Sequence, residues 1–138
     1  MNPRLALVAH DIVIAADTGV PSAFHVMEGI VSESYPMFLP MIAFLTVWHK
    51  EEGDPDEARG AMAVSLDDEQ LISQDMDLTF SGSNVARLVA RLQGLVIPHP
   101  GALKFSYKIG DKEAAYTVDT SSRANMTGVT NPAPVPQG

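Results

Sequence analysis

The stretch from Leu103 to Val118 most restricts how this chain can fold, because apolar and polar side chains alternate along most of it. It begins LKFSYKI and, after a Gly-Asp pair, resumes as KEAAYTV. Successive side chains of a β-strand point to opposite faces, so this period of two is typical of a half-buried strand. A helix would spread the same side chains around its circumference. The pattern therefore predicts two strands.

The Gly-Asp pair between the two runs predicts a two-residue hairpin turn, since glycine readily adopts the positive φ that such turns need. In that register Leu103 lies opposite Val118 on the apolar face. On the polar face Lys108 lies opposite Glu113, a cross-strand pair that contributes roughly 0.2–1 kcal/mol. A slip of one residue would place apolar side chains opposite polar ones throughout. We therefore expect this hairpin in this register.

The rest of the chain reads mainly as further strands separated by turns. Met41–His49 is apolar on both faces, which is typical of a strand covered on both sides near the centre of a sheet. The segment YPMFLP before it is expected to be a connector, and Lys50–Gly60 an exposed loop. The other predicted strands are Leu5–Ala16, Phe24–Val31, Ala61–Leu66 and Leu71–Phe80.

Ser83–Gly94 fits both a helical stripe and a strand, and its extended neighbours favour the strand. About eight strands then predict an all-β fold, a two-layer antiparallel β-sandwich over residues 1–120, with a closed barrel as the alternative. Residues 121–138 contain few large side chains and several prolines, which predicts a flexible extended C-terminal tail. A protein partner, or a neighbouring copy of the chain, is expected to order that tail.

The charge balance restricts the partners. Nine Lys and Arg against seventeen Asp and Glu give a net charge of −8, and the positive charges are scattered. Nucleic-acid backbones and anionic membranes require clustered cations, so we expect neither as a partner. The chain has no cysteine, and His10 and Asp11 interrupt the N-terminal apolar run. These features predict a soluble, cytoplasmic protein without a signal peptide or transmembrane helix.

The N-terminal segment HDIVI, the YPMFLP connector and above all the segment IPHPGALKFSYKIGDKEAAYTV resemble a group of small bacterial domains of unknown function that are predicted to be β-sandwiches. The resemblance covers roughly Leu5–Thr120 and is most specific at the Ile-Pro-x-Pro-Gly entry to the final hairpin. It implies a fold and no activity, because that group has no established catalytic residues.

The turn Asp17-Thr18-Gly19 matches the loop that aspartic proteases place at the end of a strand, where two carboxylates share a proton and activate water. A chain of this length would need to dimerise to provide both. Against this interpretation, Val20 and Pro21 follow the glycine, and no apolar-apolar-Gly element follows downstream. Asp, Thr and Gly are also ordinary turn residues.

Other candidate sites have structural explanations. The four histidines, His10, His25, His49 and His99, lack close metal-ligand spacing, although His10 and His25 lie on adjacent predicted strands with Asp11 nearby. The acidic clusters do not match a calcium loop and read as solvated turns. Trp48, with Phe44 and Tyr35, suits either a core or a carbohydrate-binding face. The acidic clusters are Glu51–Glu57, Asp67–Glu69 and Asp75–Asp77.

The sequence therefore predicts a non-enzymatic interaction or structural module with no catalytic, cofactor or metal-binding residues. We expect it to act by self-association as a homo-oligomer or by docking to a protein partner. The alternatives are a dimeric aspartic protease that uses Asp17, and a module that binds a small ligand or carbohydrate.

Overall fold

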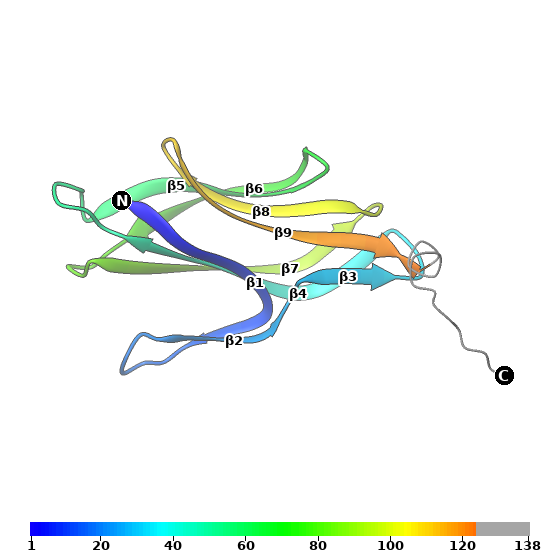
Figure 1. Ribbon diagram of the computed structural model, residues 1–138, viewed down its shortest axis with the longest axis horizontal. Helices are drawn as coiled ribbons and strands as arrows, with labels where there is room; N and C mark the ends of the chain where they lie inside the picture. Colours follow the sequence, from blue (N-terminus) through cyan, green and yellow to red (C-terminus); the bar gives the residue numbers. More distant parts are fainter. Residues whose placement is uncertain (124–138) are drawn as a thin grey trace.

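Two sheets packed face to face form the protein in the computed structural model, which describes residues 1–123 (Figure 1). Within these residues there is no helix long and apolar enough to cross a membrane. The strands are β1 (Asn2–Ile14), β2 (Pro21–Val26), β3 (Gly29–Ser32), β4 (Met37–His49), β5 (Glu57–Leu66), β6 (Glu69–Thr79), β7 (Val85–Ile97), β8 (Gly101–Ile109) and β9 (Lys112–Ser122).

One sheet has the order β2-β1-β4-β7 and the other the order β3-β9-β8-β5-β6, so the predicted β-sandwich is confirmed. Neighbouring strands are antiparallel except for β3 and β9, which run parallel. The apolar strand predicted at Met41–His49 forms most of β4, between β1 and β7. Both of its faces are covered, because Ile42 and Phe44 lie in the core between the sheets while Ala43 and Leu45 form a second apolar cluster with Ile12.

The final hairpin has the predicted register. Leu103 pairs with Val118 across β8 and β9, and Lys108 pairs with Glu113. The expected salt bridge is displaced, however, because the Glu113 carboxylate lies 3.4 Å from the ammonium of Lys104, which is on the same face of β8 four residues before Lys108. The backbone register thus follows the turn, whereas the long lysine side chains decide which ammonium reaches the carboxylate.

The ambiguous segment Ser83–Gly94 is a strand from Val85 onward, as its neighbours indicated. β7 pairs with β4 along its whole length, and its Ala86, Ala90 and Leu92 face the core. The two strands bend together where Pro40 lies opposite Gly94, which has a φ of 73°. Pro40 therefore lies inside β4, so the expectation that YPMFLP is only a connector was wrong from Met37 onward.

The predicted strand Phe24–Val31 was also wrong as a single element. It divides at Met27-Glu28 into β2, which pairs with β1, and β3, which crosses to the other sheet beside β9. Both pieces have a composition typical of strands, so the sequence gives no sign of the break. The break arises because β2 pairs with β1 in one sheet and β3 pairs with β9 in the other.

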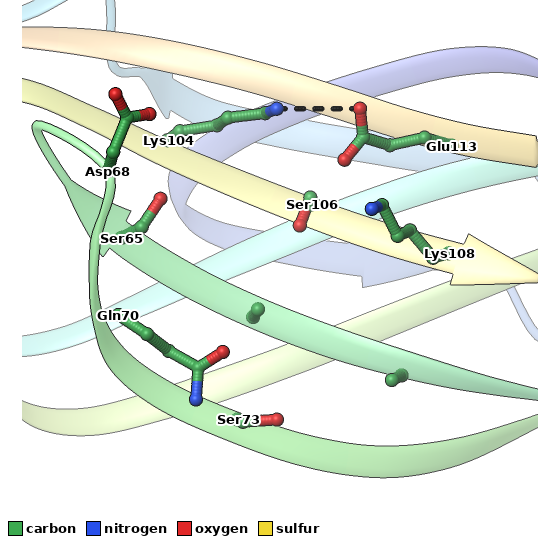
Figure 2. Close-up of a pocket in the computed structure, with 10 residues that line it drawn as sticks. Ser65, Asp68, Gln70, Ser73, Lys104, Ser106, Lys108 and Glu113 are labelled. Carbon is green, nitrogen blue, oxygen red and sulfur yellow. Dashed lines mark hydrogen bonds and ion pairs between the residues drawn. The ribbon is translucent and has the colours of Figure 1, made fainter.

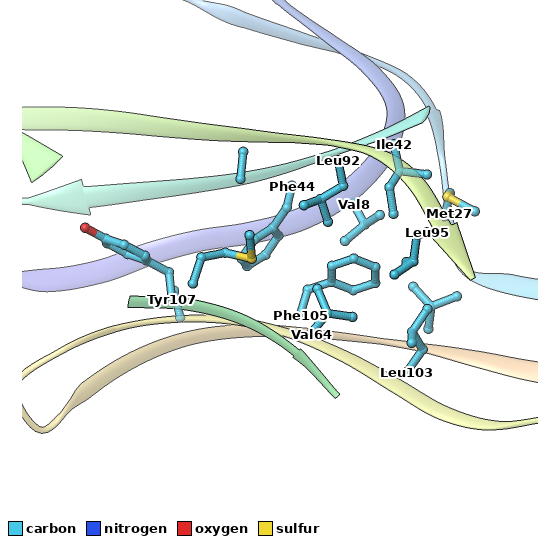
Figure 3. Close-up of a cluster of buried hydrophobic side chains, with 14 of the residues drawn as sticks. Val8, Met27, Ile42, Phe44, Val64, Leu92, Leu95, Leu103, Phe105 and Tyr107 are labelled. Atoms are coloured by element: carbon cyan, nitrogen blue, oxygen red, sulfur yellow. The ribbon is translucent and has the colours of Figure 1, made fainter. Parts of the chain in front are cut away.

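The core between the sheets is apolar and aromatic, as Figure 3 shows for residues from both layers. The Phe44 and Phe105 rings lie 5.8 Å apart between centroids, and the Trp48 and Tyr107 rings meet edge to face at 5.9 Å. Such aromatic pairs contribute about 0.5–1.5 kcal/mol each beyond the burial of their area.

The C-terminal strand β9 continues to Ser122, and its Ser121 and Ser122 pair with Val31 and Ser32 of β3. The rest of the predicted tail, residues 124–138, lies outside the described residues.

Candidate functional site

The N-terminal hairpin leaves the sandwich halfway along its first strand. β1 pairs with β4 only as far as Ala9, opposite Ala43, whereas its pairing with β2 continues to Ile14. Continuing the ladder with β4 would bring Ile12 opposite Pro40, which has no N–H to donate. Residues 10–26, which we call the β1–β2 arm, bend away below β4 and β7 (Figure 1).

The arm is held against the outer face of its own sheet. The Arg91 guanidinium on β7 donates to the carbonyl oxygen of Ile12 at 2.5 Å and lies 3.8 Å from the Asp11 carboxylate. Ile12 itself is fully buried in a small apolar cluster with Ala43 and Leu45 of β4. One face of the arm is therefore packed, and its position is set by contacts with β4 and β7.

The opposite face of the arm is open and carries three apolar side chains, together with Asp11 opposite Phe24. Val13 lies opposite Ser22 and shares its face with Phe24, because alternate residues of a strand point the same way. The Val20 carbonyl oxygen accepts a 3.0 Å hydrogen bond from the N–H of Ala15, which extends the pairing of the two strands by one more position. Val20 is two residues before Ser22, so its side chain lies on the same face. Val13, Val20 and Phe24 are 48%, 53% and 51% exposed. Exposed apolar side chains grouped in this way are typical of interaction surfaces.

The edge of the sheet at β2 differs from the other three sheet edges. All residues of β2 after Pro21 are exposed, and the strand, PSAFHV, contains no Asp, Glu, Lys or Arg, so its one protective residue is the proline at its first position. Proteins usually protect sheet edges with charges, prolines or very short strands, which discourage pairing with another chain. The other edges follow this rule: β6 carries Glu69, Asp75 and Asp77, β7 carries Arg87 and Arg91, and the four-residue β3 lies between Glu28 and Glu33.

The predicted protease turn lies at the tip of the same arm. Asp17 and Thr18 are exposed, and the Thr18 hydroxyl accepts a 3.2 Å hydrogen bond from the N–H of Val20. Gly19 takes a φ of 70°, which glycine adopts without strain. Turn formation thus explains all three residue types, and the protease interpretation stays a prediction.

Two of the four histidines meet as the strand prediction suggested. The rings of His10 and His25 lie edge to face across β1 and β2, with centroids 5.6 Å apart. His49 ends β4, and the Nδ1 atom of His99 lies 2.9 Å from the Pro100 carbonyl oxygen in the loop between β7 and β8. Within residues 1–123, no three side chains from His, Asp or Glu gather in a way that could hold a metal ion.

Two acidic residues before β5, Asp54 and Asp56, accept hydrogen bonds from backbone N–H groups in the turns around them. The Asp54 carboxylate contacts the amino terminus and accepts a 2.8 Å hydrogen bond from the N–H of Glu51, and these contacts lower its pKa. A 2.9 Å hydrogen bond from the N–H of Gly82 likewise lowers the pKa of Asp56. Backbone donors therefore stabilise both ionised carboxylates, in agreement with the expectation of solvated turns.

The aromatic residues that suggested a carbohydrate surface lie away from solvent. Trp48 is 0% exposed, and its Nε1 atom donates to the Thr46 hydroxyl at 3.0 Å. Phe44 is buried beside Phe105, and the Tyr35 hydroxyl donates to the Ser121 carbonyl oxygen at 2.8 Å. These side chains support the packing and offer no row of exposed rings.

A shallow trough of about 350 Å³ on the outer face of the other sheet was missed by sequence reasoning (Figure 2). Small side chains, including Ala61, Ala63 and Ser106, line it together with Lys108. The Lys108 ammonium makes no ion pair or hydrogen bond within residues 1–123. The residues of the trough come from β5, β6, β8 and the segments beside them, so no single stretch of sequence predicts it. The one indication in the sequence is the alternation of small residues in AMAVS, residues 61–65.

No family model matches the chain, and no curated protein is significantly similar to it. The resemblance to small bacterial β-sandwich domains therefore stays a prediction.

Proposed function

We propose that this protein is a non-enzymatic interaction module that associates with copies of itself along the open β2 edge of the β1–β2 arm. The observation that carries this proposal is the uncharged, exposed edge at β2, beside three half-exposed apolar side chains. A strand edge offers unpaired N–H and C=O groups, and a second strand can satisfy them by extending the sheet.

The chemistry of the arm favours a second copy as the partner. Two-fold pairing would bring each β2 edge against its own equivalent, so the Phe24 side chains of both copies would share one interface. β2 contributes no charge of its own, and therefore no like charges would face each other along the new ladder. Burial of Val13, Val20 and Phe24 would supply the apolar contribution.

The net charge of −8 opposes this association over longer distances. Added salt screens repulsion between two acidic copies but leaves apolar contact and backbone hydrogen bonds in place. We therefore expect the dimer to become more stable as ionic strength rises, which is the opposite of an interface built on salt bridges.

Sedimentation velocity over a range of protein concentrations tests the proposal. The wild type is expected to shift towards a dimer as concentration rises, whereas Phe24→Lys is expected to remain monomeric, because a charge on the open edge disfavours pairing. Gln74→Lys places the same charge on exposed β6, at the edge of the other sheet, and serves as the control. A wild type that is monomeric at every concentration would refute self-association.

Cysteine cross-linking locates the interface, because the natural chain contains no cysteine. Ser22→Cys places a thiol on exposed β2 and is expected to give a disulfide-linked dimer under mild oxidation. Ser73→Cys places one on exposed β6 as the matched control. Equal cross-linking of the two variants would contradict an interface at β2.

The trough on the other sheet supports a second candidate function, binding of a small polar or anionic ligand. The Lys108 ammonium, which has no ion pair or hydrogen bond within residues 1–123, lies there near Ser106, and the Ser65 hydroxyl group lies at the other end of the trough (Figure 2). Calorimetry against a panel of sugars and small anions tests this function, with Lys108→Ala as the variant that should lose binding. Absence of binding across the panel would leave the interaction module as the only proposal.

A further inference from the structure

We propose that His10 and His25 form a two-imidazole site for a divalent transition-metal ion such as Zn²⁺, Ni²⁺ or Cu²⁺ at the base of the β1–β2 arm. The site belongs to a single copy of the chain. Its existence therefore does not depend on the self-association proposed above.

The spacing of the two rings suits one shared ion. The His10 and His25 centroids lie 5.6 Å apart on neighbouring strands, between the paired positions Ala9–Val26 and Asp11–Phe24. Two imidazoles that bind one zinc ion at about 2.0–2.1 Å in tetrahedral geometry hold their centroids roughly 5 Å apart. The rings now meet edge to face, so both must turn about their side-chain torsions until one nitrogen of each points at the ion. Both side chains are exposed, which leaves room for this movement and for an incoming ion.

The backbone of His25 provides an independent observation. His25 has a φ of 59°, in the left-handed region that non-glycine residues seldom occupy. The other non-glycine residues with positive φ within residues 1–123, Asp67, Asp68 and Ser81, lie in turns between strands. Among these non-glycine residues, His25 alone adopts the conformation inside a strand. Strained conformations of this kind cluster at binding sites, where the strain serves a function.

The ligand set selects the class of ion. Neutral imidazole suits Zn²⁺, Ni²⁺ and Cu²⁺, whereas Ca²⁺ and Mg²⁺ prefer oxygen ligands. The nearest acidic residue in sequence, Asp11, already accepts a 2.8 Å hydrogen bond from the N–H of Ile12 and faces Arg91. Water is therefore expected to occupy the remaining coordination positions of the ion.

Calorimetry with Zn²⁺ on the chain without an affinity tag tests the site. We expect one ion per chain, with the affinity reduced at least about tenfold in His10→Gln, since the loss of outer-shell partners alone costs about 10–100-fold. His25→Asn is the second variant, because asparagine tolerates the left-handed conformation and should preserve the fold. His99→Gln, in the loop between β7 and β8, is the control and should bind as the wild type does.

Electron paramagnetic resonance with Cu²⁺ identifies the ligands directly. The wild type is expected to show hyperfine coupling to two imidazole nitrogens, and His10→Gln to only one. Absence of Zn²⁺ binding in the wild type, or binding by both variants with the affinity of the wild type and an unchanged circular dichroism spectrum, would overturn the metal site. Neither result would affect the cross-linking test at Ser22, so the two proposals can fail separately.

Discussion

The β8–β9 hairpin and the β1–β2 arm are both antiparallel hairpins, yet they use their apolar residues in opposite ways. In β8, Leu103, Phe105 and Tyr107 all point to the core and are 0% exposed, while the outer positions carry lysine and serine. In the arm, Ile12 is buried on one face, while Val13 and Phe24 are about half exposed on the other. A hairpin with one apolar face completes a core, whereas one with apolar side chains on both faces leaves some of them exposed to solvent.

Alanine substitution of a phenylalanine in each hairpin gives the strongest test of this comparison. Phe105→Ala should lower the free energy of unfolding by about 3–5 kcal/mol, because it leaves a cavity between the sheets. Phe24→Ala removes the same ring from an exposed strand and should change stability by less than about 0.5 kcal/mol. Urea denaturation of both variants at low protein concentration measures the difference. Similar losses would mean that the arm belongs to the cooperative core.

Gly60→Ala tests how closely the strands beside the β8–β9 hairpin approach each other. A Cβ atom at Gly60 would lie 2.5 Å from the Tyr107 ring and 2.7 Å from the Lys108 carbonyl oxygen. Overpacking of this kind costs about 1–3 kcal/mol. Gly29→Ala in β3 is the control, because its Cβ would meet only the Asp119 carbonyl oxygen at 3.5 Å. In thermal unfolding, the midpoint temperature of Gly60→Ala should be well below that of Gly29→Ala.

Tyr107→Phe separates packing from hydrogen bonding within β8. The Tyr107 hydroxyl donates to the Met76 carbonyl oxygen at 2.6 Å, and such a bond contributes about 1 kcal/mol. Burial, with a contribution from Asp77, raises the pKa of Tyr107 to about 12. The unfolded chain ionises nearer the ordinary value of about 10, so Tyr107 stabilises the fold fully below that pH.

The contribution of Tyr107 to the free energy of unfolding is lost as the pH rises from about 10 towards 12. Urea denaturation of the wild type and Tyr107→Phe across this range measures the effect. The difference in stability between them should shrink as the pH rises. A constant difference would contradict the burial of this hydroxyl.

Arg91→Ala should give the smallest change in global stability, below about 1 kcal/mol, because the Arg91 side chain is largely exposed. Its effect should concentrate in the arm, where the contact with the Ile12 carbonyl oxygen is lost. Hydrogen exchange should quicken for amides of the β1–β2 arm and stay unchanged in β8 and β9. Arg59→Ala, which removes an exposed ion pair with Asp77, provides the control. Equal exchange in both variants would show that Arg91 does not anchor the arm.

The parts of the fold that sequence reasoning predicted correctly are those where local signals agree. Alternation and a Gly-Asp turn specify the β8–β9 register without reference to the rest of the chain, and the apolar run of β4 indicates a central strand. One error arose where a distant strand decides the outcome, since the chain breaks after Val26 because β3 pairs with β9. The other arose within the hairpin, where the Glu113 carboxylate contacts the Lys104 ammonium although Lys108 lies opposite Glu113 in the ladder.

The candidate site was only partly visible in the sequence. The meeting of His10 and His25 followed from adjacent strands, but the open face around Phe24 did not. Apolar residues in a strand usually signal burial, and exposure depends on which neighbours the sheet provides. The trough around Lys108 required the side-by-side order of β5, β6 and β8, which alternation within one strand does not encode.

The sequence by itself determined that the chain forms strands, where the last hairpin turns, and which side chains of that hairpin face inward. Side-chain alternation and turn geometry act over a few residues, so they can be recognised without the rest of the molecule. Only the tertiary structure decided that the first hairpin separates from β4 after Ala9 and leaves the edge of β2 uncovered. Sheet order and edge exposure depend on pairing between residues far apart in the chain, and that pairing is settled when the whole core assembles.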